Sequence, residues 1–223
     1  MSHLRLYNFG CRGSSPAPST PDCPTIEYGG NTTSFFVKGG PFNIGIDNGS
    51  GVRRMGQWLF RNKLGMNQFF IWCQTHYHTD HTQGLPFNAI HFIPSNKFSF
   101  HGLLPLSRQA PSTLGDCIET LLAEQQALPF FPVPFGSLPA QRQYQSHPAQ
   151  FSQSFWYMYD PTEASNPGKA YQCWATDPGT PFGPENVIQI TTVPVNHPDG
   201  CLGFRIDYMG ESLASLSDHE PQR

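Results

Sequence analysis

Residues 74–81, with the sequence QTHYHTDH, place three imidazoles and one carboxylate within six positions, in His76, His78, Asp80 and His81. Nitrogen and oxygen donors at this density suit a divalent transition metal such as Zn²⁺. A packed core has little use for such a cluster, because each buried ring nitrogen would need its own hydrogen-bond partner. The stretch therefore predicts a metal site.

The cluster follows an apolar run, residues 68–73 (QFFIWC), which is typical of a strand buried on both faces. The ligands would then lie beyond the carboxyl end of a central strand, where α/β sheets commonly place their chemistry. If the cluster is extended, alternation groups His76, His78 and Asp80 on one face and leaves His81 at the turn. Two of these side chains can then hold one metal while Asp80 and His81 reach a second. A tag remnant or a histidine-rich surface loop would lack this apolar run and the Gly-Leu-Pro turn that follows the cluster.

The pattern His-x-His-x-Asp-His after an apolar strand resembles the signature of the metallo-β-lactamase fold superfamily. Further stretches agree in order with the branch related to ribonuclease Z and cyclic-nucleotide phosphodiesterases. They are GCRGSSP at 10–16, YGGNT at 28–32, DNGSG at 47–51, FPV at 131–133, NHPDG at 196–200 and SDHE at 217–220. The likeness spans nearly the whole chain. It implies an α/β protein with the four-layer αββα metallo-β-lactamase fold.

The resemblance implies two further metal ligands. His197, directly after an apolar strand, would complete a three-histidine site with His76 and His78, and Asp218 would bridge two metals. Without the matched context, a structural role would be the first interpretation of each. His219 would point to the opposite face from Asp218 and is left out of the ligand set. The remaining histidines are expected on the surface or in the core: His3, His91, His101 and His147.

The chain departs from the family pattern at its C-terminal end. Relatives continue past the Asp218 segment with a helix, a strand and a Gly-His-Ser motif whose histidine completes the second metal site, whereas this sequence stops at Arg223. We therefore expect a fold that is incomplete at the C-terminal end, with one flank of a sheet uncovered. The second site would be one protein ligand short. The alternatives are a weakly bound second metal with extra water, a ligand from another chain, or a truncated gene product.

The implied activity is metal-dependent hydrolysis with two divalent ions, Zn²⁺ first and Mn²⁺ as the alternative. Two ions about 3.5–4 Å apart would hold a hydroxide and lower the pKa of its parent water toward ~7. Asp80 is the expected catalytic residue, because its carboxylate can orient the nucleophile or accept its proton. No substrate-binding residue is assigned. The ligands divide into His76, His78 and His197 for the first ion, Asp80 and His81 for the second, and Asp218 for both.

Small phosphodiesters, such as nucleotides or cyclic nucleotides, are the first substrate class, because phosphoryl transfer mostly demands positioning and charge neutralisation. The net charge of −3 gives no general attraction for nucleic acid, and no basic extension for transfer RNA is visible. Long nucleic acid is therefore not expected. Backbone donors of residues 10–15 are candidates for holding a phosphate, and a tight turn is the equal alternative.

Two other functions remain open. The same fold supports acyl hydrolases acting on thioesters, lactones or β-lactams, because fold does not fix substrate. A catalytically impaired metal-binding or interaction protein is the third hypothesis, since the last metal ligand is missing.

Length and composition fit this interpretation. The 223 residues suffice for one domain over residues 1–223. A proline- and aromatic-rich insertion at about 94–184 is expected to form loops or extensions that cover a core. No apolar run reaches the ~20 residues of a membrane span, and no signal peptide is visible, so a cytoplasmic protein without membrane contact is expected. A homodimer is expected from the resemblance and the incomplete sheet. The six cysteines lack a Cys-x-x-Cys pair, which favours reduced, mostly buried thiols.

Periodicity and turn residues predict the regular elements. We expect one helix from about residue 52 that ends near Gly65, a possible C′ glycine. A second helix would begin at Ser112 or Thr113, include Leu114, and end near Gln126. The last strand pair should form a hairpin turning at residues 210–211. The predicted strands cover residues 4–9, 34–38, 42–47, 187–195 and 201–218, the second and third forming a hairpin.

Overall fold

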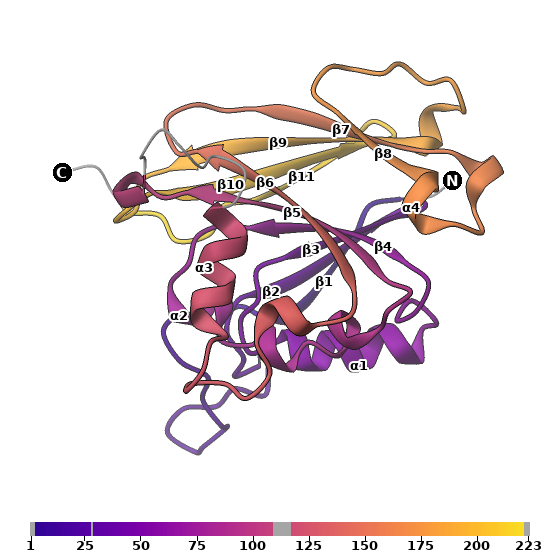
Figure 1. The fold of residues 1–223 in the computed structure, drawn as a ribbon. Coiled ribbons are helices and arrows are strands. Elements are labelled where there is room, and N and C mark those ends of the chain that lie inside the picture. The colour runs from indigo at the N-terminus through magenta and orange to yellow at the C-terminus, as the bar shows by residue number, and fades with distance from the viewer. Residues whose placement is uncertain (1–2, 28, 109–116, 221–223) are drawn as a thin grey trace.

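Two β-sheets pack face to face in the computed structural model, which describes residues 3–27, 29–108 and 117–220 (Figure 1). The first sheet has six strands, which lie side by side in the order of the sequence. Its strands β1 to β3 run antiparallel and its strands β3 to β6 run parallel. They are β1 (Arg5–Gly10), β2 (Ser34–Gly39), β3 (Phe42–Ile46), β4 (Phe69–Gln74), β5 (Lys97–Leu104) and β6 (Gln141–Pro148).

The second sheet has five antiparallel strands in the order β11-β10-β9-β7-β8. The predicted strand over residues 187–195 is confirmed, and the predicted hairpin from Cys201 turns at Gly210, whose φ of 80° favours glycine. The hairpin ends at Ser215, before Asp218, so this ligand candidate lies beyond the strand. The strands are β7 (Ser154–Tyr159), β8 (Tyr171–Trp174), β9 (Val187–Val195), β10 (Cys201–Tyr208) and β11 (Glu211–Ser215).

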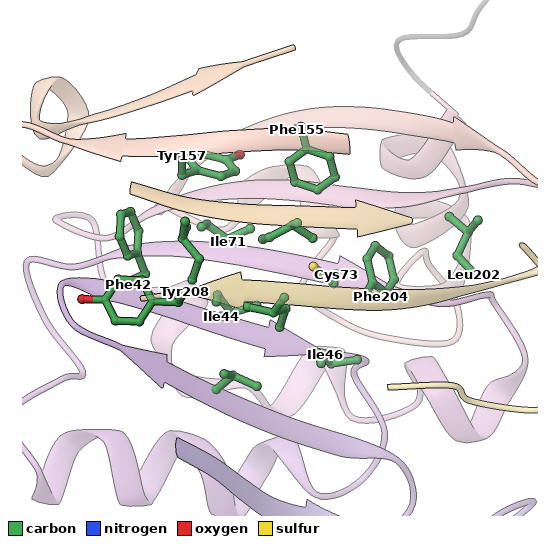
Figure 2. Close-up of a cluster of buried hydrophobic side chains, with 14 of the residues drawn as sticks. Phe42, Ile44, Ile46, Ile71, Cys73, Phe155, Tyr157, Leu202, Phe204 and Tyr208 are labelled. Atoms are coloured by element: carbon green, nitrogen blue, oxygen red, sulfur yellow. The ribbon is translucent and has the colours of Figure 1, made fainter. Parts of the chain in front are cut away.

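Strand β4 is buried along its whole length because it has a core on each face. Its alternate residues Phe69, Ile71 and Cys73 point between the two sheets, while Phe70 and Trp72 point toward the helices. Figure 2 shows the inter-sheet core, in which side chains of β3 and β4 meet those of β7 and β10. The apolar run in the sequence is therefore the central strand that it predicts.

Two longer helices cover the outer face of the first sheet, α1 (Val52–Arg61) and α3 (Cys117–Gln125) (Figure 1). Apolar side chains of both helices enter the core that contains Trp72. The described residues thus form three layers, helix, sheet and sheet, of the expected four. The remaining helical segments are short: α2 (Thr79–Thr82), α4 (Pro167–Ala170), η1 (Leu85–Phe87), η2 (Ala89–Phe92), η3 (Leu106–Arg108), η4 (Phe135–Ser137), η5 (Pro161–Glu163) and η6 (Pro184–Asn186).

Helix α1 ends earlier than the sequence predicts. Its last residue is Arg61, the cap is Asn62, and the left-handed conformation belongs to Lys63 with φ of 59°. Gly65 is therefore not the C′ residue. The predicted start of the second helix, Ser112 or Thr113, and its Leu114 lie outside the described residues.

The insertion at residues 94–184 is more regular than expected. It contributes β5 and β6 to the first sheet and β7 and β8 to the second, four strands that the sequence analysis does not predict, and it holds helix α3, which ends close to the predicted Gln126. Strand β6 shows why the pattern misleads. Its sequence QRQYQSHP alternates exposed and half-buried side chains at an edge of the sheet and has no apolar run.

Cysteine burial differs from the expectation of mostly buried thiols. Cys73 and Cys201 are buried, whereas Cys11, Cys23 and Cys173 are exposed, and none of these five is in a disulfide. No helix among the described residues is both long enough and apolar enough to cross a membrane.

Candidate metal centre

The six predicted ligands converge at one edge of the two sheets, because strands β4, β9 and β11 end there and helix α2 follows β4. The positions follow from the topology: His76 and His78 come directly after β4, Asp80 and His81 lie in α2, His197 follows β9, and Asp218 follows β11. We expected Asp80 to lie on an extended segment. It lies instead in helix α2, because the chain turns into this helix after His78. That turn separates Asp80 from His76 and His78 and places it beside His81.

Three imidazoles and a carboxylate form the first group. His78 Nδ1 lies 3.1 Å from His76 Nε2 and 3.0 Å from His197 Nε2. Asp218 Oδ2 lies 3.9 Å from His76 Nε2 and 3.8 Å from His197 Nε2. One donor atom from each of the four residues falls within 4.8 Å of the others, which is the crowding a single cation requires.

Asp80, His81 and the same Asp218 form the second group. His81 Nε2 lies 3.5 Å from Asp80 Oδ2 and 3.4 Å from Asp218 Oδ1. Asp218 therefore turns one oxygen toward each group. A carboxylate placed in this way can bridge two metal ions.

The imidazole of His81 is held by Asp47, a residue without an assigned role in the sequence analysis. His81 Nδ1 lies 2.8 Å from Asp47 Oδ2, and both side chains are fully buried. A proton on Nδ1 leaves the lone pair of Nε2 available to a metal. That Nε2 atom is buried without a hydrogen-bond partner. An unpaired buried nitrogen is costly, and a cation at this point would satisfy it.

Gln74 ties the loop of the centre together. Its Nε2 donates to Asp47 Oδ1 at 3.1 Å, to the His76 carbonyl at 2.8 Å and to the His81 carbonyl at 3.0 Å, while Asn48 donates to its Oε1. Only one signal in the sequence could have identified Gln74, a polar residue closing an apolar strand. Its contacts rigidify the path from β4 to α2.

Electrostatics distinguish the two groups. Burial, the largest cause, and the neighbouring His81, His78 and His197 together lower the pKa of His76 to about 2, so His76 is neutral and available as a ligand. For His81, burial is the largest influence and lowers the pKa, but Asp47, Asp80 and Asp218 together raise it to about 9. The second group therefore favours a positive charge beside His81, whether a proton or a metal ion.

The glycine-rich loop after β1 contacts the second group. Ser14 N donates to Asp80 Oδ2 at 2.8 Å, so one of the backbone donors proposed for a phosphate orients the candidate catalytic carboxylate. Gly49 also packs against Asp80, since an added Cβ at Gly49 would lie 2.5 Å from the Asp80 carbonyl oxygen. Only glycine permits that approach.

The histidines left out of the ligand set lie elsewhere. His219 is exposed beside Asp218, and His3 is exposed at the N-terminal end, where it pairs with Glu211. The others are buried away from the centre: His91, His101 and His147.

Two hollows flank the first group. A cavity of about 380 Å³ reaches Asp218 from the side of β1, β2 and β11, with Leu6, Phe35, Leu213 and Leu216 in its lining. A second cavity of about 250 Å³ lies against His76 and His78 from the side of β5 and α3. Space for a substrate thus exists on two sides of the candidate ligands.

The donor set fits a divalent transition metal. Histidine nitrogens and carboxylate oxygens suit Zn²⁺ or Mn²⁺. Two ions fit this centre, because His81 Nε2 has no hydrogen-bond partner and Asp218 turns one oxygen toward each group.

Comparison with known proteins identifies the fold. No family model matches the sequence, and no curated protein matches it. Three solved structures are similar at 14% identity each: the metallo-β-lactamase fold protein YhfI from Bacillus subtilis (TM-score 0.51), human tRNase Z, short form (0.54), and a diphosphatase from the PhnP family (0.52). They cover 96%, 96% and 92% of this chain, which spans 61%, 68% and 62% of theirs.

The chain thus has the metallo-β-lactamase fold, as the histidine motif predicts. It spans about two thirds of the length of these similar structures.

Proposed function

We propose that this chain is a metal-dependent hydrolase that binds two divalent ions, Zn²⁺ first and Mn²⁺ as the alternative. The main support is Asp218, whose two oxygens lie within 3.9 Å of histidine nitrogens from both groups. The first ion would take His76, His78 and His197. The second would take Asp80 and His81, and Asp218 would contact both.

Bound ions would polarise the scissile group and lower the pKa of a coordinated water. The protein residues would supply orientation and proton transfer. Asp80, held by Ser14 N, can orient the attacking water or accept its proton. Asp47 keeps the proton of His81 on Nδ1 and away from the metal side.

We further propose a small phosphodiester as substrate, such as a nucleotide or cyclic nucleotide. Two of the similar proteins are named tRNase Z and diphosphatase, which supports phosphate ester chemistry at low sequence identity. The net charge of −3 disfavours long nucleic acid.

A panel assay tests this function. Protein loaded with Zn²⁺ or Mn²⁺ is given bis-p-nitrophenyl phosphate, cyclic nucleotides and a transfer RNA precursor, and bound metal is counted by mass spectrometry. We expect turnover of the small diesters, lost in His78→Ala and kept in the matched control His219→Ala. Two ions per chain support the proposal. One ion or none, without turnover, would favour the non-catalytic metal-binding alternative.

Acyl hydrolysis is the second candidate. The cavity of about 380 Å³ beside Asp218 has the apolar side chains Leu6, Phe35, Leu213 and Leu216 in its lining, which would suit an acyl chain. Hydrolysis of thioesters or lactones without hydrolysis of any phosphodiester would select this function.

We also propose a single domain and a homodimer. The single domain is supported by the core that both sheets share. The dimer is supported by the edge strands β1 and β11, which offer backbone groups for pairing with another chain. Light scattering after size-exclusion chromatography measures the oligomeric state.

A further inference from the structure

The imidazole of His197 turns one nitrogen toward the first group and the other away from it. Its Nε2 lies 3.0 Å from His78 Nδ1 and 3.8 Å from Asp218 Oδ2, so Nε2 is the atom that would bind a metal ion. Its Nδ1 is on the other side of the ring, where it is buried and has no hydrogen-bond partner. For Nε2 to offer its lone pair, Nδ1 must carry the proton of the neutral ring. A buried N–H without an acceptor would make this tautomer costly.

A carboxylate faces this buried nitrogen. Glu220 Oε1 lies 3.4 Å from His197 Nδ1, slightly beyond the usual hydrogen-bond range of about 2.7–3.2 Å. The side chain of Glu220 is 57% exposed, so a small rotation can bring the oxygen into that range. The imidazole of His197 is only 10% exposed, so water has little access to compete for the same position.

Backbone contacts hold Glu220 beside the loop of His197. The amide of Glu220 donates to the carbonyl of Asn196 at 2.8 Å, and Asn196 Nδ2 donates to the carbonyl of Glu220 at 2.9 Å. These two hydrogen bonds join the residue before His197 to the segment that follows Asp218. They fix the two candidate ligands relative to each other, although neither ligand takes part in them.

Two other candidate ligands have an oxygen at the same position of the ring. His81 Nδ1 lies 2.8 Å from Asp47 Oδ2, and His76 Nδ1 lies 3.1 Å from Thr75 Oγ1. In both residues Nε2 is the atom that faces Asp218. An acceptor behind a ligating imidazole keeps the proton on Nδ1, orients the ring and makes Nε2 a stronger ligand.

We propose that Glu220 is a positioning residue of the first metal site. Its carboxylate accepts the Nδ1 proton of His197, which leaves Nε2 free for the ion, and its backbone contacts with Asn196 hold Asp218 beside His197. The proposal rests on the metal binding of the proposed function and adds a residue that this function does not use. Glu220 lies behind His197, on the side away from the ion, so it acts through the imidazole and is not a ligand.

Removing the carboxylate is the first test. Zn²⁺ affinity is measured by competition with a chromophoric chelator in an Asp80→Ala background, which removes a ligand of the second ion. We expect Glu220→Ala to weaken binding of the first ion about tenfold, the lower end of the effect of such partners, because the side chain is half-exposed. Glu220→Gln should lie between Glu220→Ala and the parent protein, because its amide oxygen still accepts a hydrogen bond but has no charge. His219→Ala, at the exposed neighbouring position, is the matched control and should bind as the parent does. Equal affinities of Glu220→Ala and the parent would overturn the proposal.

The tautomer of His197 is the second test and needs no metal. Long-range proton–nitrogen correlation spectra of the metal-free protein at pH 8 distinguish a proton on Nδ1 from one on Nε2. We expect the proton on Nδ1 in the wild type and in His219→Ala, and a larger share of it on Nε2 in Glu220→Ala. A merely structural role of Glu220 would leave the tautomer unchanged. The same tautomer in Glu220→Ala and the wild type would therefore refute the role of this carboxylate.

Ester hydrolysis separates this inference from the function on which it rests. If Zn²⁺ affinity and tautomer depend on Glu220 as expected but no ester is hydrolysed, the role of Glu220 stands and the hydrolase function fails. If esters are hydrolysed while Glu220→Ala has the affinity and the tautomer of the wild type, the function stands and the role of Glu220 fails.

Discussion

His81 Nδ1 lies 2.8 Å from Asp47 Oδ2, and both side chains are fully buried. The two residues are 34 positions apart in the sequence. The contact joins the end of β3 to helix α2 and presents Nε2 of His81 to Asp80 and Asp218. A carboxylate behind a ligating histidine fixes the tautomer and strengthens the ligand.

Replacing Asp47 should weaken the second metal site. We expect Asp47→Asn to lower metal affinity there by about 10- to 100-fold and to leave the first site occupied, because His76, His78 and His197 do not contact Asp47. Metal titration followed by calorimetry measures both affinities. Asp207→Asn, which removes a carboxylate from β10 outside the centre, is the control. Equal weakening of both sites would contradict the division into two groups.

Replacing Asp218 should affect both sites together. The two Asp218 oxygens lie 3.9 Å from His76 Nε2 and 3.4 Å from His81 Nε2, and Asp218→Asn replaces one of them with an amide NH2 group and removes the negative charge. Bound metal should fall from two ions toward fewer than one per chain at a metal concentration that saturates the wild type. His78→Ala should instead lose the first ion preferentially. If Asp218→Asn retains two ions, this residue does not bridge.

The histidine motif and the apolar run before it are enough to predict the central strand and most of the centre. Both faces of β4 are covered, so its residues are apolar at successive positions instead of alternating with polar ones. This is why the apolar run predicts a buried strand. His197 follows β9, a strand with a clear pattern, but its choice as a ligand depends on the family resemblance. Asp218 depends on the family resemblance, since nothing in its own neighbourhood distinguishes it.

The residues that sequence patterns miss are those whose roles come from distant contacts. Asp47 and Gln74 meet only after β3 and β4 pair. The helical turn at Asp80 is likewise not visible locally. Helix α2 has four residues, and Gln74 holds its His81 carbonyl from outside the helix, so tertiary contacts decide its conformation.

Replacing His91 with phenylalanine should stabilise the fold. Both ring nitrogens of His91 are buried without a hydrogen-bond partner, and the ring stacks on Phe98 at 4.2 Å between centroids. Phenylalanine keeps the stacking and removes the unpaired polar atoms. We expect His91→Phe to raise the free energy of unfolding by ~1–3 kcal/mol at pH 7.5, measured by urea denaturation. His219→Phe, at an exposed position, should change it little.

The same variant should resist acid better. Burial lowers the pKa of His91 to about 3, with a smaller contribution from Arg142, while the unfolded chain keeps a value near 6.5. Below pH 6.5 the unfolded state binds the proton first, so wild-type stability falls as the pH drops toward 3. At pH 5, protonation of His91 in the unfolded state lowers the wild-type free energy of unfolding by about 2 kcal/mol. The stability difference between His91→Phe and the wild type should therefore grow between pH 7 and pH 5. A constant difference would show that His91 is not protonated on unfolding.

A buried chain of polar groups joins the two sheets through Tyr157. Tyr157 Oη lies 2.7 Å from His101 Nε2 and also contacts Ser99 Oγ, while His101 Nδ1 lies 2.9 Å from His147 Nε2. If each hydroxyl and ring donates to the next group, the chain is satisfied with both histidines neutral, in agreement with burial lowering the pKa of each.

Removing the Tyr157 hydroxyl interrupts this chain at its centre. In Tyr157→Phe, His101 and Ser99 lose a partner inside a core without access to water, so we expect a loss of ~1–3 kcal/mol in the free energy of unfolding. Tyr159→Phe, a half-buried tyrosine on the same strand, is the matched control and should cost less. The ring of Tyr157 also packs on Phe69 and Phe155, contacts that phenylalanine preserves, so the difference between the two variants reports the hydroxyl. If Tyr157→Phe has the same free energy of unfolding as the wild type, the hydrogen bonds of the Tyr157 hydroxyl do not stabilise the packing of the two sheets.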